Sequence, residues 1–498
     1  MSLITRASSL AALALVSTSP LLAEPDLDGQ WQSLGQGFDL PTGDATNITF
    51  FSFYSVGIEV DGSTFTQTEI DLLNDREFES ESGSFTLGHG PATGFFFANL
   101  EGTPIRQWVN TEGDVLLWPA TQTSLPDDEI EPFDRDIFFE VALKVPETLS
   151  AEAMAGTWIG AGYEVHIDGL ILHTIADFYA RTYMVTIRAD GTLDYALTST
   201  TDEDEEDQLG LTFRDVGWNF SGGYFVMPSN PDQMGIVNAA HDIMLLAGIE
   251  VETFDTFVTQ DVFLRQPTSL VADDVVGTWA AAALYLWDDL ITNAYSGGEV
   301  ERDLIDLRAD GTFTVYPTHM TEGMTGPYQA EGVWEVEAQH LVLTFQGEEF
   351  PLYLNASKNF AARVEGETDF DGGNISATYF VKLSDEAIDP ALAYYPGSEP
   401  LDHDGLMRNP WFGHYWSQHY PWIYHPDHHW LWSQGDGGAS MVYYDQTLGW
   451  VYTTPELYPM MWIYDYEGTT GWFSFMRRND ATRVFWDFAV GAKLMVND

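Results

Sequence analysis

The chain has 498 residues, no cysteine and a formal net charge of −58, with 45% hydrophobic and 14% aromatic residues. This length predicts three or four domains, and the apolar content can form cores without disulfide bonds. Nucleic acid and anionic membranes are excluded as partners, because both need a basic face. The charge indicates a solvated surface adapted to seawater or brine. Salt shortens the range of charge repulsion, from about 10 Å at 0.1 M to about 3 Å at 1 M. Many cation-binding sites would be the alternative.

The N-terminus has the features of a secretory signal peptide over residues 1–23. It carries one positive charge at Arg6, an apolar run from Leu10 to Val16 and a small residue at Ala23, as such leaders do. The apolar run is too short to span a bilayer. The sequence therefore predicts an exported protein in the periplasm, at the cell surface or outside the cell, with no transmembrane span.

Internal repeats predict the domain organisation, because a fixed period marks repeated units. MAGTWIG at 154–160 recurs as VVGTWAA at 275–281, and VTIRADGTLDY at 185–195 recurs as IDLRADGTFTVY at 305–316. A weaker first copy begins with LDGQWQS at 27–33. We therefore expect three β-domains, over residues 24–150, 151–270 and 271–390.

Each copy is rich in strand-like alternation around an Asp-Gly turn, at Asp61, Asp190 and Asp310, which is typical of tight hairpins. Residues 232–250, DQMGIVNAAHDIMLLAGIE, carry apolar residues at helical spacing and predict one helix. The fold class expected is all-β and mainly antiparallel, with three tandem barrel or curved-sheet domains.

A short pattern in each copy resembles the lipocalin (calycin) family. The pattern joins a Gly-x-Trp motif near the first strand to a basic residue on the last strand: Gly29/Trp31 with Lys144, Gly156/Trp158 with Arg265, and Gly277/Trp279 with Lys382. The resemblance implies barrels in which the tryptophan closes the floor and the cation lies across its ring, a contact of about 0.5–2 kcal/mol. Barrel mouths could then hold a small apolar ligand; the alternative is interiors filled by side chains.

A turn in the third copy has oxygen ligands at calcium-like spacing. TDFDGGN at 368–374 places Asp369, Asp371 and Asn374 around two glycines, but it lacks the terminal glutamate of an EF-hand. The segment predicts either a Ca²⁺ loop or an ordinary turn.

The last quarter of the chain changes in composition. Residues 391–405 are predicted to be a linker, and residues 406–498 a small aromatic domain of β-hairpin repeats. YPWIYHPDHHWLW at 420–432 corresponds to YPMMWIYDYEGTTGWFSF at 458–475. Trp430 and Trp472 are 42 residues apart, as are Asp445 and Asp487, and Gly449 and Gly491. Stacked hairpins of this kind share a continuous core. The pattern resembles the Trp/Tyr/Gly-rich repeat modules at the C-termini of bacterial exported proteins.

Three interpretations of these aromatic residues remain open. They could form the core of a minimal stack, since each ring buries 150–250 Å². Exposed rings could instead stack on sugars, and the candidates are Trp411, Trp416, Trp422, Tyr424, Trp430, Trp432, Trp450 and Trp472. His425, Asp427 and His428 could bind a metal such as Zn²⁺, because imidazole suits that ion, although no recognised zinc spacing is present.

No catalytic motif is present in the sequence. It contains no nucleophile elbow, P-loop or dinucleotide fingerprint. Paired carboxylates do not indicate glycosidase chemistry here, because they occur everywhere in so acidic a chain. We therefore expect a non-catalytic binding or surface protein that requires no cofactor. The β-domains would bind or display a ligand, and the aromatic C-terminus would attach to the cell envelope or a polysaccharide. A secreted polysaccharide-active enzyme with a C-terminal targeting module is the alternative.

Overall fold

The computed structural model describes residues 27–497 with gaps at 41–49, 62–63, 72–75, 78–80, 88–94, 101–102, 124–134, 169–173, 203–207, 222–223, 229, 252–254, 290–294, 318–329, 370–371, 386–398, 401–405, 420–421, 436–440, 455–456, 467–468 and 480–481. The predicted signal peptide lies outside the described residues, as does most of the predicted linker. In the described part, no helix has the length and apolar character needed to cross a membrane.

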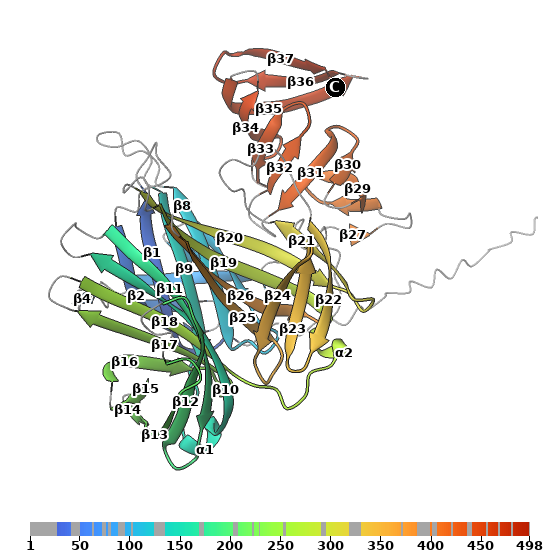
Figure 1. Cartoon of the computed structure of the whole chain (residues 1–498). Coiled ribbons are helices and arrows are strands. Elements are labelled where there is room, and N and C mark those ends of the chain that lie inside the picture. The colour runs from blue at the N-terminus through green and yellow to red at the C-terminus, as the bar shows by residue number, and fades with distance from the viewer. Residues whose placement is uncertain are drawn as a thin grey trace, which may run out of the picture.

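The protein is all-β and antiparallel, as the sequence predicts (Figure 1). The two helices of the described residues have a single turn each, α1 (Ala151–Met154) and α2 (Ala272–Val275). They precede the first strands of the second and third barrels.

The first barrel contains nine strands in the order β2-β1-β9-β8-β7-β6-β5-β3-β4. Because β2 also pairs with β3, eight of the strands form a closed ring and β4 lies beside it. The strands are β1 (Gly29–Leu40), β2 (Phe50–Asp61), β3 (Thr64–Asp71), β4 (Arg76–Glu77), β5 (Glu81–Leu87), β6 (Phe95–Leu100), β7 (Thr103–Val109), β8 (Val115–Thr123) and β9 (Arg135–Lys144).

The second unit is a nearly closed sheet in the order β13-β12-β11-β10-β18-β17-β16-β15-β14. Its two edge strands, β13 and β14, follow each other in sequence. The strands are β10 (Gly156–Asp168), β11 (Thr174–Ile187), β12 (Thr192–Thr200), β13 (Thr212–Gly217), β14 (Asn219–Ser221), β15 (Tyr224–Met227), β16 (Asn230–Val237), β17 (Ile243–Val251) and β18 (Asp255–Arg265).

The third unit is a closed barrel of eight strands in chain order, β19 to β26. The strands are β19 (Gly277–Asp289), β20 (Tyr295–Leu307), β21 (Thr312–Pro317), β22 (Ala330–Glu337), β23 (His340–Phe345), β24 (Glu348–Leu354), β25 (Phe360–Asp369) and β26 (Gly372–Ser384). The Asp-Gly turns at Asp190 and Asp310 connect hairpins in the second and third units, and in both the Asp side chain accepts a hydrogen bond from the backbone of the following threonine at 3.0 Å.

The helix predicted over residues 232–250 is wrong: the segment forms the β16–β17 hairpin. Strand β17 is buried on both faces, since Ile243 and Leu245 face the neighbouring barrels and Met244 and Leu246 face its own interior. A strand buried on both faces is apolar throughout rather than alternating. Its sequence therefore imitates the spacing of a buried helix.

The Gly-x-Trp motif and the last-strand cation meet in each barrel. Trp31 pairs with Lys144, Trp158 with Arg265 and Trp279 with Lys382 across neighbouring strands. The Nζ atoms of Lys144 and Lys382 lie 5.9 Å from the centroids of their indole rings. Each indole N–H also donates to a carbonyl four residues earlier, at 2.9–3.0 Å. These contacts close one end of every barrel.

Apolar side chains fill the closed ends of the barrels. In the third barrel a cavity of about 10 Å³ remains beside Trp279 and Phe380, which is about the space that one water molecule needs. The largest buried cluster draws on the outer surfaces of all three barrels and on the C-terminal sheet. On β19, for example, Ala280 and Ala282 face this shared core while Trp279 and Ala281 face the barrel interior. The barrels are therefore packed on one another.

Three equivalent hairpin loops, residues 110–114, 238–242 and 355–359, form what we call the loop junction. In each loop the first asparagine accepts two backbone N–H bonds at 2.9–3.1 Å. The loops then bind one another: Asn238 donates to Asp114 at 2.8 Å, and Asn355 donates to Asp242 at 3.0 Å. One chain of buried hydrogen bonds thus connects the three barrels.

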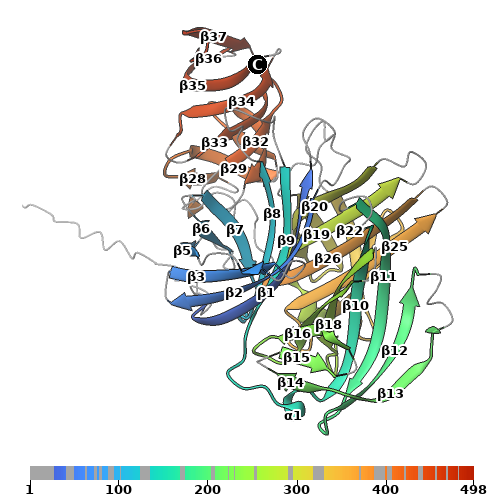
Figure 2. The ribbon, with the colours of Figure 1, turned by 90° about the vertical axis from the view of Figure 1, so that its left-hand side faces the viewer.

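The fourth unit is an eleven-stranded meander, β27 to β37, in which every strand pairs with its sequence neighbours. It extends from one end of the barrels, with β37 at its far tip (Figure 2). The strands are β27 (Glu399–Pro400), β28 (Leu406–Asn409), β29 (Gly413–His419), β30 (Trp422–His425), β31 (His429–Gly435), β32 (Met441–Asp445), β33 (Gly449–Thr453), β34 (Met460–Tyr466), β35 (Thr469–Asn479), β36 (Thr482–Asp487) and β37 (Ala492–Asn497).

Candidate functional site

The C-terminal sheet buries one face and presents the other, which we call the outer face. Alternate residues of the strands supply the buried face. Among them are Tyr415, Ile423, Leu431 and Tyr443, whose side chains are fully buried. The intervening residues are mostly tryptophan and tyrosine. Because side chains alternate along a strand, these rings share the outer face.

The rings of the outer face form cross-strand ladders. The strand pairing places Trp416 beside Tyr424 and Tyr424 beside Trp430, and it aligns Trp422, Trp432, Tyr444 and Trp450 in a second row. A third row contains Tyr452, Trp462 and Trp472. Ring centroids lie 5.3–6.0 Å apart in the pairs Trp416–Tyr424, Tyr424–Trp430, Tyr444–Trp450 and Trp462–Trp472. Such cross-strand aromatic pairs stabilise a sheet by about 0.2–1 kcal/mol each.

Exposure differs among these rings. Trp416 and Trp430 are 38% and 40% exposed, Tyr464 is 53% exposed and Trp486 is 36% exposed, whereas Trp432 is 3% exposed. The remaining rings of the outer face are partly exposed. The ladder thus combines a structural role at its buried members with a wide, partly apolar surface at the others, and contiguous exposed patches of this kind are typical of binding sites.

The structure brings seven of the eight predicted sugar-stacking residues to this one face: Trp416, Trp422, Tyr424, Trp430, Trp432, Trp450 and Trp472. Trp411 lies elsewhere, in the β28–β29 turn, where its ring packs against Tyr458 at 5.8 Å. The sequence reasoning missed Tyr444, Tyr452, Trp462 and Trp486. The available signals were the two-residue spacing of Tyr452 from Trp450 and the 42-residue repeat spacing between Tyr444 and Trp486.

Four hairpin turns of the sheet share one capping arrangement. The side chains of Asn409, Asp445 and Asp487 each accept backbone N–H bonds from residues two and three positions later, at 2.8–3.2 Å. His425 occupies the same position, and its Nδ1 accepts the N–H groups of Asp427 and His428 at 3.1 and 3.3 Å. Trp430 on β31 and Trp472 on β35 are four strands apart, so each 42-residue unit of the sequence spans two hairpins.

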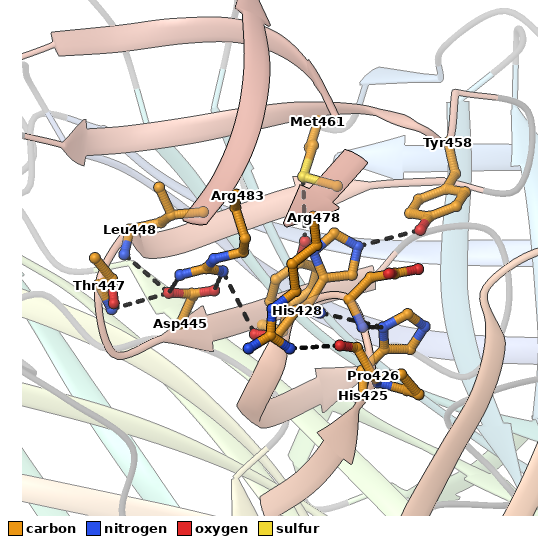
Figure 3. Close-up of polar contacts among 12 residues, drawn as sticks. His425, Pro426, His428, Asp445, Thr447, Leu448, Tyr458, Met461, Arg478 and Arg483 are labelled. Carbon is orange, nitrogen blue, oxygen red and sulfur yellow. Dashed lines mark hydrogen bonds and ion pairs between the residues drawn. The ribbon is translucent and has the colours of Figure 1, made fainter. Parts of the chain in front are cut away.

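A polar cluster lies inside the sheet, on its buried face (Figure 3). Arg483 is 1% exposed and forms a two-point ion pair with Asp445, with Nη2 to Oδ1 at 3.1 Å. His428 Nε2 shares a hydrogen bond with the Tyr458 hydroxyl at 3.1 Å. A buried pair is costly to break, because the remaining charge would be left without a partner.

Burial disfavours the charged form of both histidines on the buried face. Burial lowers the pKa of His425 below its ordinary value, and burial together with the neighbouring His425 and Arg483 lowers the pKa of His428 further. His425 Nε2 donates to the Phe412 carbonyl at 2.8 Å, while its Nδ1 accepts. Both nitrogens of the ring are thus engaged with the backbone, which fixes one neutral tautomer.

The residues predicted to bind metal are placed as follows. His425 and His428 are buried with ring centroids 4.9 Å apart, and Asp427 is exposed. Asp369 pairs with Gly372 at the β25–β26 hairpin, Asn374 is exposed, and Asp371 lies outside the described residues. Across the part of the chain that the structure describes, no three His, Asp or Glu side chains are grouped so that they could hold a metal ion.

One carboxyl group inside the first barrel has a strongly altered acidity. Glu140 is 5% exposed, and burial raises its pKa to about 7, against hydrogen bonds from Ser33 and Tyr54 that lower it. Its Oε1 atom has no hydrogen-bond partner. The absent side chain of Gly35 leaves the space that the Tyr54 ring fills, since a Cβ there would lie 2.6 Å from that ring. A carboxyl group enclosed in this way does not reach a polymer on the surface.

No protein-family model and no protein with a curated description matches the sequence. Among solved structures, a protein of the DUF3598 family from Nostoc punctiforme is 12% identical, with a TM-score of 0.18, and covers 47% of this chain and 99% of its own. Transferrin binding protein B from Haemophilus parasuis is 9% identical (TM-score 0.22, covering 71% of this chain and 76% of its own). The protein of that name from Neisseria meningitidis is 10% identical (0.21, 72% and 77%). Scores this low carry no information about function.

Proposed function

We propose that this chain is an exported, non-catalytic binding protein that attaches to a polysaccharide through the outer face of its C-terminal sheet. The observation that supports this most strongly is the ladder of aromatic rings, which gathers seven predicted sugar-stacking residues on one surface. The polysaccharide could belong to the cell envelope or to an external source, and its chemistry is the same in either case.

The physical basis is the flat, preorganised surface that the rings provide. Rings on neighbouring strands repeat at the strand spacing of about 4.8 Å, and cross-strand contacts hold them in place. A ligand that stacks on them therefore orders few side chains, and low ordering cost favours affinity. Trp416 and Trp430, which are 38% and 40% exposed and both contact Tyr424, are the strongest candidates for direct contact.

The barrels support a role in display rather than in capture of a ligand. The floors of the first and third barrels have the Trp–cation arrangement that the lipocalin resemblance implies, and the cavity beside Trp279 in the third barrel has a volume of about 10 Å³. A small apolar ligand would need a far larger cavity, of about 300 Å³ or more. We infer that the packed barrels are the body that the aromatic sheet attaches to a surface.

Affinity electrophoresis of the full chain in gels containing soluble neutral and acidic polysaccharides tests this function. We expect retardation by at least one polymer, and we expect the Trp416→Ala/Trp430→Ala double variant to lose about tenfold or more in affinity. Phe213→Ala is the matched control, because Phe213 is an aromatic residue on the second barrel that is 37% exposed. Unretarded migration in every gel, or equal retardation of the double variant, would contradict the proposal.

A further inference from the structure

The last strand of the C-terminal sheet has an open edge. Within the residues that the structure describes, β37 pairs with β36 and with no other strand. Its second row of backbone N–H and C=O groups therefore faces outward, and such a row is a template for pairing with another strand. At the opposite end of the sheet, β27 is only two residues long and contains Pro400, features that protect an edge.

Apolar side chains surround this open edge. Phe488 and Val490, in the turn that precedes β37, are 51% and 72% exposed, and Met495 on β37 is 66% exposed. Trp486 lies directly opposite Lys493 on the adjoining strand. Exposed apolar side chains beside an unpaired strand edge favour pairing with another strand. The apolar surface here is therefore suited to being covered.

The charge of this region indicates what covers it. Residues 470–498 carry four cations and three carboxylates, whereas the whole chain carries 19 and 77. Two copies of so acidic a protein repel each other over most of their surface, and this end, whose formal charge is close to zero, adds little to that repulsion. The edge also lies at the tip of the sheet, away from the barrels (Figure 1), so contact between two tips keeps the acidic barrels apart.

We propose that two copies of this chain pair through β37, antiparallel and related by a twofold axis, so that their aromatic sheets join into one. The same strand of each copy, Ala492–Asn497, supplies the backbone hydrogen bonds. A twofold axis makes an antiparallel pair of identical strands self-complementary, and Met495 of each copy becomes covered. Dimerisation also places two outer faces in one assembly, which raises the avidity for a polymer.

Sedimentation equilibrium of the full chain in about 0.5 M NaCl, where charge repulsion is strongly screened, tests this pairing. We expect a dimer, and we expect Met495→Lys to weaken it by about tenfold or more, because a lysine at the edge opposes pairing. Val333→Lys, at a position on β22 of the third barrel that is 55% exposed, is the matched control and should leave the dimer intact.

Hydrogen exchange provides the second measurement. The amides of residues 492–497 should gain protection as the protein concentration rises. Met495→Lys should abolish that gain while leaving unchanged the melting temperature measured at low concentration, where both proteins are monomers. A monomer at every concentration overturns the proposal, and so does a dimer that tolerates Met495→Lys or shows no concentration-dependent protection at β37. Because polysaccharide binding is measured separately, either proposal can fail alone.

Discussion

His425 performs with an imidazole what Asn409 and Asp445 perform with an oxygen, since each caps a hairpin turn by accepting two backbone N–H groups. The imidazole carries a consequence that an amide does not. It can be protonated, and a protonated Nδ1 can no longer accept. The dense histidines of the sequence suggested a metal site, but the sequence contained no information on which ring atoms the backbone engages.

The buried histidines predict acid sensitivity of the C-terminal sheet. Burial lowers the pKa of His425 and His428, so the unfolded chain binds more protons. The stability gained from neutral rings is present above about pH 6.5 and is lost as the pH falls below it. His425→Asn should retain the cap, change stability at pH 8 by about 1 kcal/mol or less, and reduce the loss between pH 8 and pH 5.

Urea unfolding followed by tryptophan fluorescence measures this difference. His340→Asn is the control, because His340 is a partly exposed histidine on β23 of the third barrel, outside the C-terminal sheet. An acid-side loss as large in His425→Asn as in the parent protein would show that this ring does not contribute.

The raised pKa of Glu140 gives the stability of the first barrel the opposite pH dependence. Its pKa is raised from 4.5 to about 7, so the folded state retains a proton that the unfolded chain releases. Its contribution to stability is complete below pH 4.5 and is lost as the pH rises through 7. Glu140→Gln should therefore gain stability relative to the parent between pH 5 and pH 8, by at most about 3 kcal/mol. Chemical denaturation measures the free energy of unfolding of both proteins, and Glu59→Gln, at an exposed position, is the control. If the free energies of the parent and of Glu140→Gln change with pH in the same way, the prediction is wrong.

At the scale of elements, the sequence predicted what depends on local pattern. The Asp-Gly hairpins and the meeting of Gly-x-Trp with a last-strand cation are local signals repeated at a fixed period, and the structure contains both. The β16–β17 hairpin was mistaken for a helix because burial on two faces removes the alternation that identifies a strand. The ladder on the C-terminal sheet was predicted in part, since the partners of each strand could not be derived from spacing alone.

Gly277 tests the floor of the third barrel. It has φ +139°, and a Cβ at this position would lie 2.0 Å from the Ser384 carbonyl oxygen on β26. Gly277→Ala should therefore cost at least about 3 kcal/mol. Gly347→Ala is the control: its φ is also positive, at +92°, but nothing lies within 4 Å of the added carbon, so about 1–2 kcal/mol is expected. Thermal melting compares the two, and equal losses would contradict the steric account.

At the scale of the whole molecule, the three barrels behave in the structure as one packed body rather than as separate beads. Their outer faces share a core, and the loop junction connects them through buried hydrogen bonds. The sequence carried a trace of this arrangement, because Asn110, Asn238 and Asn355 each precede an Asp or Asn by four residues. Nothing in that spacing indicated that the loops would meet.

Asp242 tests the coupling between barrels. Its Oδ2 accepts hydrogen bonds from the Asn355 side chain at 3.0 Å and from the Ser357 backbone N–H at 2.8 Å, across two barrels. Asp242→Ala removes the acceptor of both donors, one of them on the buried Asn355 amide, at a cost of about 1–3 kcal/mol, and should separate the unfolding of the third barrel from the others. Calorimetry with the exposed Asp273→Ala as control would show a single unchanged transition if the junction does not couple the barrels.

The central claim is that the outer face of the C-terminal sheet is the surface that contacts polysaccharide. Hydroxyl-radical footprinting of the full chain, with and without the polymer that retards it most strongly, tests this claim most directly. The account predicts that Trp416, Trp430 and Tyr464 are protected by the polymer, while Trp31, Trp158 and Trp279, which are buried in the barrel floors, are unchanged. Bound polymer that leaves the outer rings as reactive as before, and protects residues of the barrels instead, would contradict it.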